Sequence, residues 1–329
     1  IQDGIDAAEP DAIVVIAAGS YPEDLLIESK AVRLWGRCPA MVEVVGSDQG
    51  IAAVTIGPGA DGTELHGIAV RGATAGVSIE DAGQALVEQL WIHDTGQMGL
   101  EVADSFGPSN ATLSNSLIER ASTMAAFAFG SSLLIESSVL RDTQLVGGTG
   151  WAVGAYDSAD SGRPAVVTVR GSVLERNLDV GVFVTGSDLV MEGSLVRQTA
   201  AGPGGQNGFG LWVEQHVATT GARSTARISG SVLEHNRGAS ILVQAADLLL
   251  DTTVVRDTLV SEDNGAVGRA LGLESDLETT ERANAIVRSS VLADSEDSGV
   301  HLSGSDLVLE STIIRNTRTG GFDNGMGLW

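Results

Sequence analysis

Two glutamates occupy equivalent places in two copies of a sequence repeat, Glu214 in one copy and Glu274 in a later one. If the copies stack as circuits of a coil, these residues lie two circuits apart, with backbones about 10 Å from each other and Gln244 between them. Inverting glycosidases hold their catalytic acid and base roughly 6.5 to 9.5 Å apart, so the pair is a candidate for glycoside hydrolysis. In so acidic a chain, both can equally be solvent-facing acids without a catalytic role.

Asparagine-glycine turns mark the longer copies of the repeat, at Asn207, Asn264 and Asn324. The first and last of these turns are soon followed by Trp212 and Trp329. A tryptophan beside a loop can stack on a sugar ring, or it can cover the loop as part of a local core. We therefore take Trp212, Trp329, Asn207 and Asn264 as candidate ligand-binding residues, with core packing as the alternative.

Metal and thiol chemistry have weaker support. Asp157 with Asp160, and Glu262 with Asp263, could offer carboxylate oxygens to calcium, but neither segment has EF-hand or glycine-rich nonapeptide spacing. We expect only weak, adventitious calcium binding, no zinc site among the scattered histidines, and no cofactor. Cys38 is the single cysteine, which excludes a disulfide within this sequence and leaves its partner open.

The charge of the chain excludes two classes of partner. Its 43 acidic and 19 basic residues give a net charge of -24, which opposes binding to nucleic acid or to anionic lipid. The sequence also lacks an apolar run of the roughly 18 residues that a membrane span needs. It starts at Ile1 without a leader and stops inside a repeat at Trp329, so we expect a trimmed piece of an exported protein.

One short phrase recurs along most of the chain, in steps that alternate between about 22 and about 34 to 37 residues. The copies are NSLIERA from Asn115, SSVLRDT from Ser137, GSVLERN from Gly171, GSLVRQT from Gly193, GSVLEHN from Gly230, TTVVRDT from Thr252, SSVLADS from Ser289 and STIIRNT from Ser311. The alternation predicts a two-rung unit of about 59 residues, where a rung is one circuit of a coil. Every second rung then carries an insertion on one side.

Short β-rich phrases separate these copies, including GVFVTG from Gly181 and GSDLVMEGS from Gly186. In them small aliphatic residues alternate with polar ones, as in strands with one buried face, and helical periodicity is nearly absent. Strands this short need a coil to bury their apolar faces. The insertions are expected at Gln144–Pro164, Ala200–Phe209, Leu259–Arg269 and Arg318–Met326, where they would offer a row of loops.

Stacking the copies brings acids beside bases, because neighbouring parallel strands lie about 4.8 Å apart. One predicted column is Glu119, Arg141, Glu175, Arg197, Glu234, Arg256, Ala293 and Arg315. A second is Glu136, Arg170, Glu192, Ser229, Asp251, Arg288 and Glu310. A third, polar column at a turn is Thr143, Asn177, Thr199, Asn236, Thr258, Ser295 and Thr317. We interpret all three as structural ladders, with a charged binding strip as the alternative for the first two.

The first 50 residues predict a cap: a short helix from Gln2 to Ala8, then apolar strands. The Ile-Gln start of that helix, a Gly-x-Tyr turn at Gly19–Tyr21 and a strand ending at Gly36 resemble the start of bacterial β-helix proteins of the pectin-lyase-like superfamily. The repeats from Asn115 onward are similar to a bacterial subfamily with tandem phrases of the VERN and GVFV type.

This resemblance covers nearly the whole chain and implies an all-β, right-handed parallel β-helix of about 12 rungs, probable export, and an extracellular or cell-surface location. Superfamily members include polysaccharide lyases, glycoside hydrolases, adhesins and other proteins. The calcium-binding Asp clusters and neighbouring catalytic Asp residues of the enzymes have no match here, so no catalytic residue is carried over.

We expect a single β-helix domain over residues 1–329, with a cap and first rungs at 1–50, divergent rungs at 51–114 and two-rung repeats from 115 onward. The leading hypothesis is a non-catalytic surface module that presents repeated loops to a glycan or a cell-surface protein. The alternative is a carbohydrate-active enzyme, a polysaccharide lyase or glycoside hydrolase with a groove along the loop-bearing face. The protein is expected to be a monomer or to associate end to end.

Overall fold

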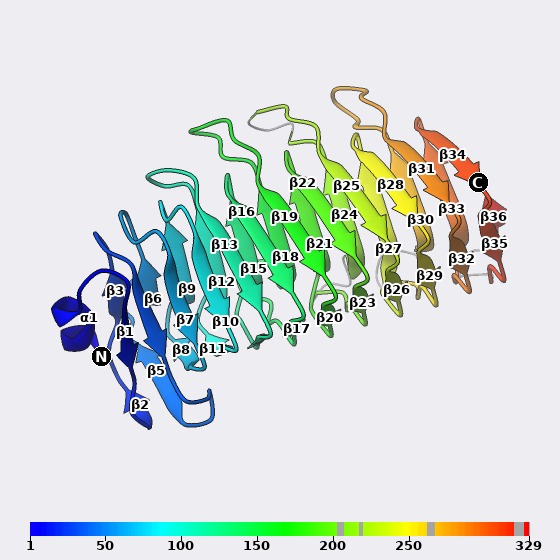
Figure 1. The fold of residues 1–329 in the computed structure, drawn as a ribbon. Helices are drawn as coiled ribbons and strands as arrows, with labels where there is room; N and C mark the ends of the chain where they lie inside the picture. The colour runs from blue at the N-terminus through cyan, green and yellow to red at the C-terminus, as the bar shows by residue number, and fades with distance from the viewer. Residues whose placement is uncertain (203–206, 217–219, 262–266, 319–325, 329) are drawn as a thin grey trace.

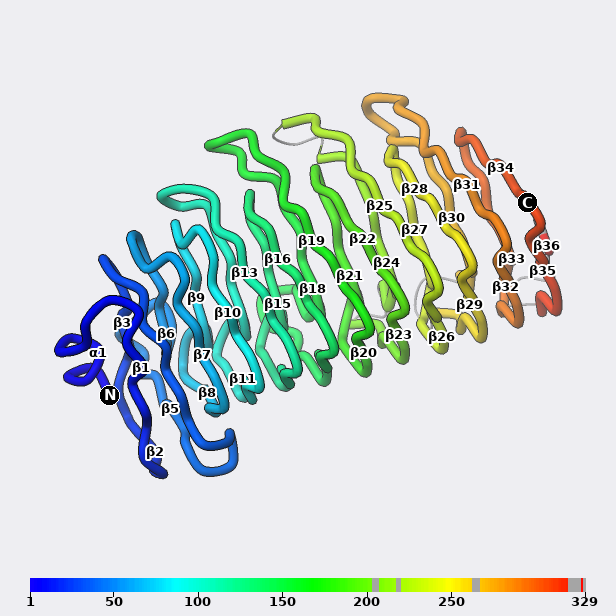
Figure 2. Tube along the Cα trace, in the orientation of Figure 1, coloured from blue at the N-terminus to red at the C-terminus, as the bar shows by residue number. Residues whose placement is uncertain are grey.

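The computed structural model describes residues 1–202, 207–216, 220–261, 267–318 and 326–328, and in them the chain coils into a parallel β-solenoid (Figure 1). Each rung contributes one strand to each of three sheets, and every described sheet contains twelve parallel strands. The rungs follow one another from the amino-terminal to the carboxy-terminal end, as the trace in Figure 2 shows. The expected all-β fold, with about 12 rungs, is confirmed.

Sheet A consists of β1 (Ala12–Val15), β4 (Val32–Trp35), β7 (Thr63–His66), β10 (Ala85–Glu88), β13 (Asn110–Ser114), β16 (Ser132–Glu136), β19 (Val166–Arg170), β22 (Asp188–Glu192), β25 (Thr225–Ser229), β28 (Asp247–Asp251), β31 (Asn284–Arg288) and β34 (Asp306–Glu310). Sheet B consists of β2 (Gly19–Tyr21), β5 (Val42–Gly46), β8 (Ala69–Gly72), β11 (Trp91–Thr95), β14 (Leu117–Glu119), β17 (Val139–Arg141), β20 (Val173–Glu175), β23 (Leu195–Arg197), β26 (Val232–Glu234), β29 (Val254–Arg256), β32 (Val291–Ala293) and β35 (Ile313–Arg315). Sheet C consists of β3 (Leu25–Ile27), β6 (Ala52–Ile56), β9 (Ala75–Glu80), β12 (Leu100–Ala103), β15 (Met124–Phe129), β18 (Trp151–Tyr156), β21 (Val180–Thr185), β24 (Phe209–Glu214), β27 (Gly238–Gln244), β30 (Gly268–Glu274), β33 (Ser298–Ser303) and β36 (Met326–Leu328).

The amino-terminal end is covered by helix α1 (Gln2–Ala7), as expected for a cap. Ile5 of this helix is buried and belongs to the same apolar core as the strands. The predicted turn at Gly19–Tyr21 is wrong, because these residues form strand β2 and pair in parallel with β5. No helix among the described residues is long and apolar enough to cross a membrane.

A core of aliphatic side chains fills the coil from the first rungs to the last described ones. Alternate residues of each strand point inward; in β16, for example, Leu133 and Ile135 are buried while the flanking Leu134 and Glu136 are not. Burying small aliphatic side chains on every rung is the main stabilising contribution, at about 25 cal/mol per Å² of apolar surface. The alternation in the sequence therefore predicts the core correctly.

Polar ladders run through the coil at two corners. At the corner between sheets B and C, the Thr143 and Thr199 backbone N–H groups donate to the side-chain oxygens of Asn177 and Asn236, at 3.3 and 3.1 Å. These four side chains are buried, so the third predicted column is confirmed as structural. Sequence reasoning missed the ladder between sheets A and B, in which each backbone N–H donates to the next hydroxyl, from Ser116 through Ser138, Ser172 and Ser194 to Ser231.

The extra residues of the long rungs form two connecting segments, one before and one after a sheet C strand. Short rungs have only two residues after that strand, such as Gly186 and Ser187 between β21 and β22. The segments after sheet C rise along one edge of the coil in Figure 1. The pairs of long segments are 142–150 and 157–165 around β18, 198–208 and 215–224 around β24, and 257–267 and 275–283 around β30.

The prediction of one insertion per long rung is therefore wrong. Strand β18 crosses the proposed insertion Gln144–Pro164, because its apolar residues enter the core. The insertions placed at Ala200–Phe209 and Leu259–Arg269 capture only the first segment of each pair. Both segments of a pair border the same outer face, that of sheet C.

Buried aspartates fasten the segments that follow sheet C. Asp157 accepts a hydrogen bond from Thr220 of the next long rung, and Asp104 accepts one of 2.5 Å from Ser161 in the same way. The short rung between two long ones passes beneath this contact. A Cβ on its Gly186 would clash with the Asp157 carboxyl group, so only glycine fits there. The glycine in the short rung therefore leaves room for the Asp157 carboxyl group.

Candidate functional site

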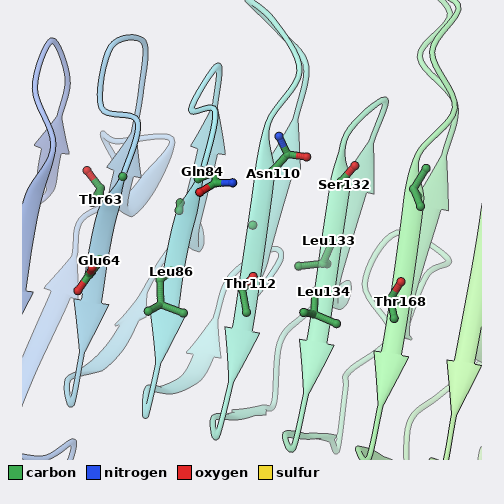
Figure 3. Close-up of a pocket in the computed structure, with 14 residues that line it drawn as sticks. Thr63, Glu64, Gln84, Leu86, Asn110, Thr112, Ser132, Leu133, Leu134 and Thr168 are labelled. Atoms are coloured by element: carbon green, nitrogen blue, oxygen red, sulfur yellow. The ribbon is translucent and has the colours of Figure 1, made fainter.

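The outer face of sheet A has a hollow of about 490 Å³, shown in Figure 3. Its floor is neutral, with Leu86, Thr112, Leu134 and Thr168 on successive strands. Glu64 is the one titratable residue among those lining the hollow, and it is already paired with His66 at 2.9 Å. This face offers space without an acid, base or nucleophile free to react.

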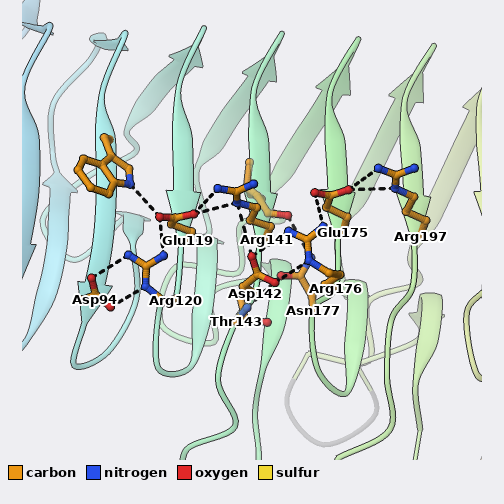
Figure 4. Close-up of polar contacts among 12 residues, drawn as sticks. Asp94, Glu119, Arg120, Arg141, Asp142, Thr143, Glu175, Arg176, Asn177 and Arg197 are labelled. Carbon is orange, nitrogen blue, oxygen red and sulfur yellow. Dashed lines mark hydrogen bonds and ion pairs between the residues drawn. The ribbon is translucent and has the colours of Figure 1, made fainter. Parts of the chain in front are cut away.

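The outer face of sheet B carries the first predicted charge column, and its rungs stack as expected (Figure 4). Arg141 bonds to Glu119, Arg197 to Glu175 and Arg256 to Glu234, each with a shortest distance of 2.6 Å. These glutamates are 4 to 8% exposed although they lie on the outside. The central expectation, that Glu175 meets Arg197 on the neighbouring rung, is confirmed.

Direct contacts in this column join residues that are 22 positions apart in the sequence, and not those separated by a long rung. Between Arg141 and Glu175 the link runs through two residues at the adjacent corner, because Arg176 donates to both Asp142, at 2.8 Å, and Glu175, at 2.6 Å (Figure 4). Burial would raise the pKa of Glu175, but hydrogen bonds from Arg197 and Arg176 outweigh burial and lower it. From Glu119 to Arg256 every charged residue of this column has a partner, which favours the structural interpretation over a binding strip.

The second predicted column, on the outer face of sheet A, also stacks in register. Arg170 bonds to Glu192 at 2.9 Å and lies 3.5 Å from Glu136, and Arg288 pairs with Asp251 at 3.1 Å. These side chains are more exposed than those of sheet B, so each pair contributes less than about 1 kcal/mol.

The outer face of sheet C differs from both, because aromatic side chains gather on it. Trp151 and Phe183 have ring centroids 4.5 Å apart, Phe183 and Trp212 5.0 Å apart, and Phe209 and Trp212 5.7 Å apart. Tyr156 stacks 6.1 Å from Trp151 at an interplanar angle of 11°. We call these five residues the aromatic platform. It lies between the paired connecting segments, so the candidate Trp212 is part of a larger surface.

Asp179 connects the platform to the segment that precedes β24. Its two carboxylate oxygens accept hydrogen bonds of 2.6 Å, one from Trp151 Nε1 and one from Asn207 Nδ2. Asn207 adopts a left-handed backbone conformation with φ +62°, as an asparagine-glycine turn requires. In this structure Asn207 therefore positions the segment beside the platform.

Beside the platform runs a column of polar residues at the ends of the sheet C strands. In register it contains Tyr156, Thr185, Glu214, Gln244 and Glu274. The two candidate glutamates are thus two rungs apart with Gln244 between them, as the repeat predicts. The column changes chemical type from rung to rung, unlike the ladders of sheet B.

Glu214 is half-buried, and its carboxyl group makes no hydrogen bond or ion pair among the described residues. Burial raises the pKa of Glu214 from 4.5 to about 7; the nearby His216 opposes this shift and Asp276 adds to it. The hydroxyl of Thr185 and Nε1 of Trp212 are also buried without a partner in the structure. With a pKa of about 7, a substantial fraction of this acid stays protonated near neutral pH, beside these polar groups of Thr185 and Trp212.

Glu274 has a different environment. Arg269 lies near the start of the same strand, and its Nη1 donates to the Glu274 carboxylate at 2.8 Å. Gly272 lies between these two residues in the strand. The two candidate glutamates thus have different surroundings, because Glu274 is bonded to an arginine and the Glu214 carboxyl group is not.

Asp157 and His216 form a further contact at the edge of the platform. Nδ1 of His216 is hydrogen-bonded to the Asp157 carboxylate, which is 1% exposed. The His216 ring meets Tyr156 edge-on, with centroids 6.0 Å apart. Burial and the charge of Glu214 raise the pKa of Tyr156, which keeps its hydroxyl protonated.

Sequence reasoning did not identify Trp151, Tyr156 or Phe183 as site residues. It also missed that Asp157 is the partner of His216. One signal was available: Asp157 and His216 are 59 residues apart, the length of the two-rung unit. Glu101 of β12 was also missed, where burial and the neighbouring Glu80 raise the pKa. It lies in a rung before the repeat becomes regular, so no pattern in the sequence singles it out.

The remaining candidates do not gather into a site in the structure. Asn264 and Trp329, and the possible calcium ligands Glu262 and Asp263, lie outside the described residues. Asp157 is bonded to protein groups while Asp160 is exposed. The described ranges contain no group of three or more His, Cys, Asp or Glu that could hold a metal ion.

A family model described as a right handed beta helix region matches residues 53–220, just over half of the chain. The chain belongs to this family. The match confirms the suspected β-helix relationship and the right-handed coil; no curated protein matches the sequence significantly.

Solved structures resemble this β-helix protein in fold. They include the catalytic unit of a GH87 alpha-1,3-glucanase from Streptomyces thermodiastaticus, with 14% identity, a TM-score of 0.63 and coverage of 94% of this chain and 64% of that one. The Dettilon tailspike protein has 11% identity and a TM-score of 0.56, with 94% and 63% covered. The Agl-KA catalytic domain has 12% identity and a TM-score of 0.55, with 90% and 62% covered. At these identities the likeness shows the fold alone, and this chain spans less than two thirds of each of these structures.

Proposed function

We propose that this β-helix binds a polysaccharide along the outer face of sheet C and hydrolyses its glycosidic bonds. The observation that carries the proposal is the half-buried Glu214 beside the aromatic platform, whose pKa of about 7 leaves a substantial fraction of its carboxyl group protonated near neutral pH. A carboxylic acid that is still protonated near neutral pH can donate a proton to the leaving oxygen of a glycosidic bond.

Glu274 supplies the second carboxyl. It lies two rungs from Glu214 in the same column, a backbone separation of about 10 Å, with Gln244 on the rung between them. Arg269 donates a hydrogen bond to the Glu274 carboxyl group and fixes its orientation, as a positioned general base requires. We assign Glu214 as general acid and Glu274 as general base of an inverting hydrolase.

The aromatic platform supports glycan binding. Trp212 and Phe209 are partly exposed, and such rings stack on the apolar faces of sugars. The structures that share the fold include a glucanase and a tailspike, which makes the enzyme hypothesis the better supported of the two. An extracellular or cell-surface location fits this activity.

A second candidate is the non-catalytic surface module that presents the same face to a glycan. The evenly paired ladders of sheets A and B favour it, because a rigid coil suits a scaffold. It requires the aromatic platform for binding but assigns Glu214 no chemical role.

Incubation with a panel of polysaccharides tests the proposal. We expect reducing sugars to be released from at least one polymer, and proton NMR of the first products to show an inverted anomeric centre. Retention of configuration would overturn the assignment of Glu274 as base. Binding without any release across the panel would support the non-catalytic module instead.

A further inference from the structure

We propose that the glycan held on the outer face of sheet C is neutral, carrying neither carboxylates nor amines along its chain. This inference rests on the proposed function and names the substrate class of the same site. The physical basis is that Asp157, Arg269 and Glu274 on this face already have partners within the protein, while the apolar part of the face is extensive.

The apolar part covers neighbouring strands. Trp151, Phe183, Trp212 and Leu242 succeed one another from β18 to β27, and Trp151, Phe183 and Leu242 are less than 9% exposed. The exposed parts of these side chains can stack on sugar rings. They carry no charge that could pair with a charged substituent of the sugar. A sugar placed here must be recognised through its C–H faces and its hydroxyl groups.

A polymer of uronic acids would bring about one carboxylate per sugar and would need cations to meet them. Arg269 is the one arginine or lysine on this face among the described strands, and it bonds to Glu274 at 2.8 Å and lies 3.8 Å from Asp297. His301 is 7% exposed, and burial lowers its pKa, so it is uncharged at neutral pH. A polyuronate would meet paired or neutral groups together with carboxylates.

A glycan that carries amino groups would need carboxylates without partners. Asp157 is 1% exposed and bonded to His216 and Thr220, and Glu274 is bonded to Arg269. The net charge of -24 still attracts any polycation at long range, but salt at about 0.15 M screens such attraction beyond about 8 Å. Local recognition of amino groups is therefore left to Glu214, whose pKa is raised by burial and whose carboxyl group the Glu214→Gln variant lacks.

Binding by the Glu214→Gln variant tests the proposal, because a variant without turnover leaves each polymer intact. The probes are neutral glucans (dextran and laminarin), polygalacturonate and chitosan oligosaccharides, measured by affinity electrophoresis and calorimetry at 0.15 M salt. We expect a neutral glucan to bind, unchanged between low and high salt, and polygalacturonate to bind about tenfold or more weakly. Equal or tighter binding of polygalacturonate or chitosan, or no binding to any neutral glycan of the panel, would overturn the proposal.

A second variant tests the role of the paired arginine. Adding Glu274→Gln removes the carboxylate partner of Arg269, so polygalacturonate binding should increase relative to the Glu214→Gln variant. Asp251→Asn is the matched control, because it removes the partner of Arg288 in an equivalent pair on sheet A and should change neither polygalacturonate nor neutral glucan binding. An unchanged polygalacturonate affinity in the Glu274→Gln variant would count against charge pairing as the cause.

The outcomes separate this inference from the proposed function. If the wild-type protein cleaves polygalacturonate, the hydrolytic function stands and the neutral substrate class falls. If the Glu214→Gln variant binds a neutral glucan that the wild type does not cleave, the substrate class stands and the catalytic assignment falls.

Discussion

The outer faces of sheets B and C are built on the same rungs with the same register, but their polar groups have opposite surroundings. On sheet B, Glu175 is 7% exposed and receives hydrogen bonds from two arginines. On sheet C, the Glu214 carboxyl group has no partner among the described residues, and the buried hydroxyl of Thr185 beside it is unbonded. The pKa of Glu175 is lowered, whereas that of Glu214 is raised.

This difference shows that a regular solenoid can keep one face free for function. Even repetition of ladders suggested a non-catalytic coil from the sequence, but those ladders belong to sheets A and B. The column on sheet C is not repetitive: Tyr156, Thr185, Glu214, Gln244 and Glu274 follow one another. Stability from two faces allows the third to keep unsatisfied groups.

The largest expected effect concerns activity. Glu214→Gln should lower turnover by about 10²- to 10⁴-fold, the usual contribution of a general acid, and Glu175→Gln should leave turnover unchanged. In the wild type, turnover should fall as the pH rises above about 7, because Glu214 then loses its proton. Initial rates of reducing-sugar release measure both effects. An equal loss of turnover in Glu214→Gln and Glu175→Gln would contradict a special role for the sheet C face.

The next largest effect concerns the contact that holds the segment beside sheet C. Gly186→Ala should destabilise the fold by about 3 kcal/mol or more, since it combines left-handed strain at φ +56° with a clash against Asp157. Gly193→Ala is the control: its φ is +55° but nothing lies within 4 Å of the added Cβ, so it should cost only about 1 to 2 kcal/mol. Chemical denaturation measures both; equal costs would show that Asp157 does not constrain the short rung.

The sheet B ladder predicts a smaller loss of stability. Glu175→Gln should cost about 1.5 to 3 kcal/mol at pH 7, because two arginines lose a charged acceptor. The exposed Glu192→Gln on sheet A should cost less than about 1 kcal/mol. The pKa of Glu175 is lowered in the folded protein, so this carboxylate stabilises the fold fully above pH 4.5, its ordinary pKa. The stabilisation is lost as the pH falls through the lower pKa of the folded state. A penalty that is the same at pH 3 and pH 7 would contradict this account.

The smallest effect has the opposite sign. The pKa of Glu214 is raised in the folded protein, so its ionisation fully destabilises the fold above about pH 7. Below pH 4.5 the residue is protonated in the folded and the unfolded state alike, and this cost is absent. Glu214→Gln should therefore raise stability by on the order of 1 to 3 kcal/mol at pH 8, with little change at pH 4. Thermal unfolding at the two pH values checks this, and destabilisation at pH 8 would indicate that Glu214 is ionised and paired.

Much of the fold follows from the sequence because each rung repeats the same local requirements. The spacing of Glu175 and Arg197 predicts their contact, and the alternation around Leu133 and Ile135 predicts the core. The split of each insertion into two segments could not be predicted, since β18 lies inside a stretch rich in glycine and serine.

The candidate site was predictable only in part. Equivalent positions in the repeat single out Glu214 and Glu274, but their different surroundings depend on the hydrogen bond from Arg269 to Glu274 and on the burial of Glu214. The aromatic platform combines residues from three rungs, among them Trp151 and Phe183, and no single phrase contains it. Neither burial nor contacts across rungs is visible in a linear pattern of residue types.

Carboxyl carbon NMR of protein labelled at glutamate side chains, with Glu214→Gln and Glu175→Gln used to assign the two signals, tests the contrast between the faces most directly. Glu214 is predicted to titrate near pH 7, and Glu175 below 4.5. A Glu214 signal that titrates at or below 4.5 would show that both faces hold ordinary ionised carboxylates, and it would contradict the assignment of sheet C as the functional face.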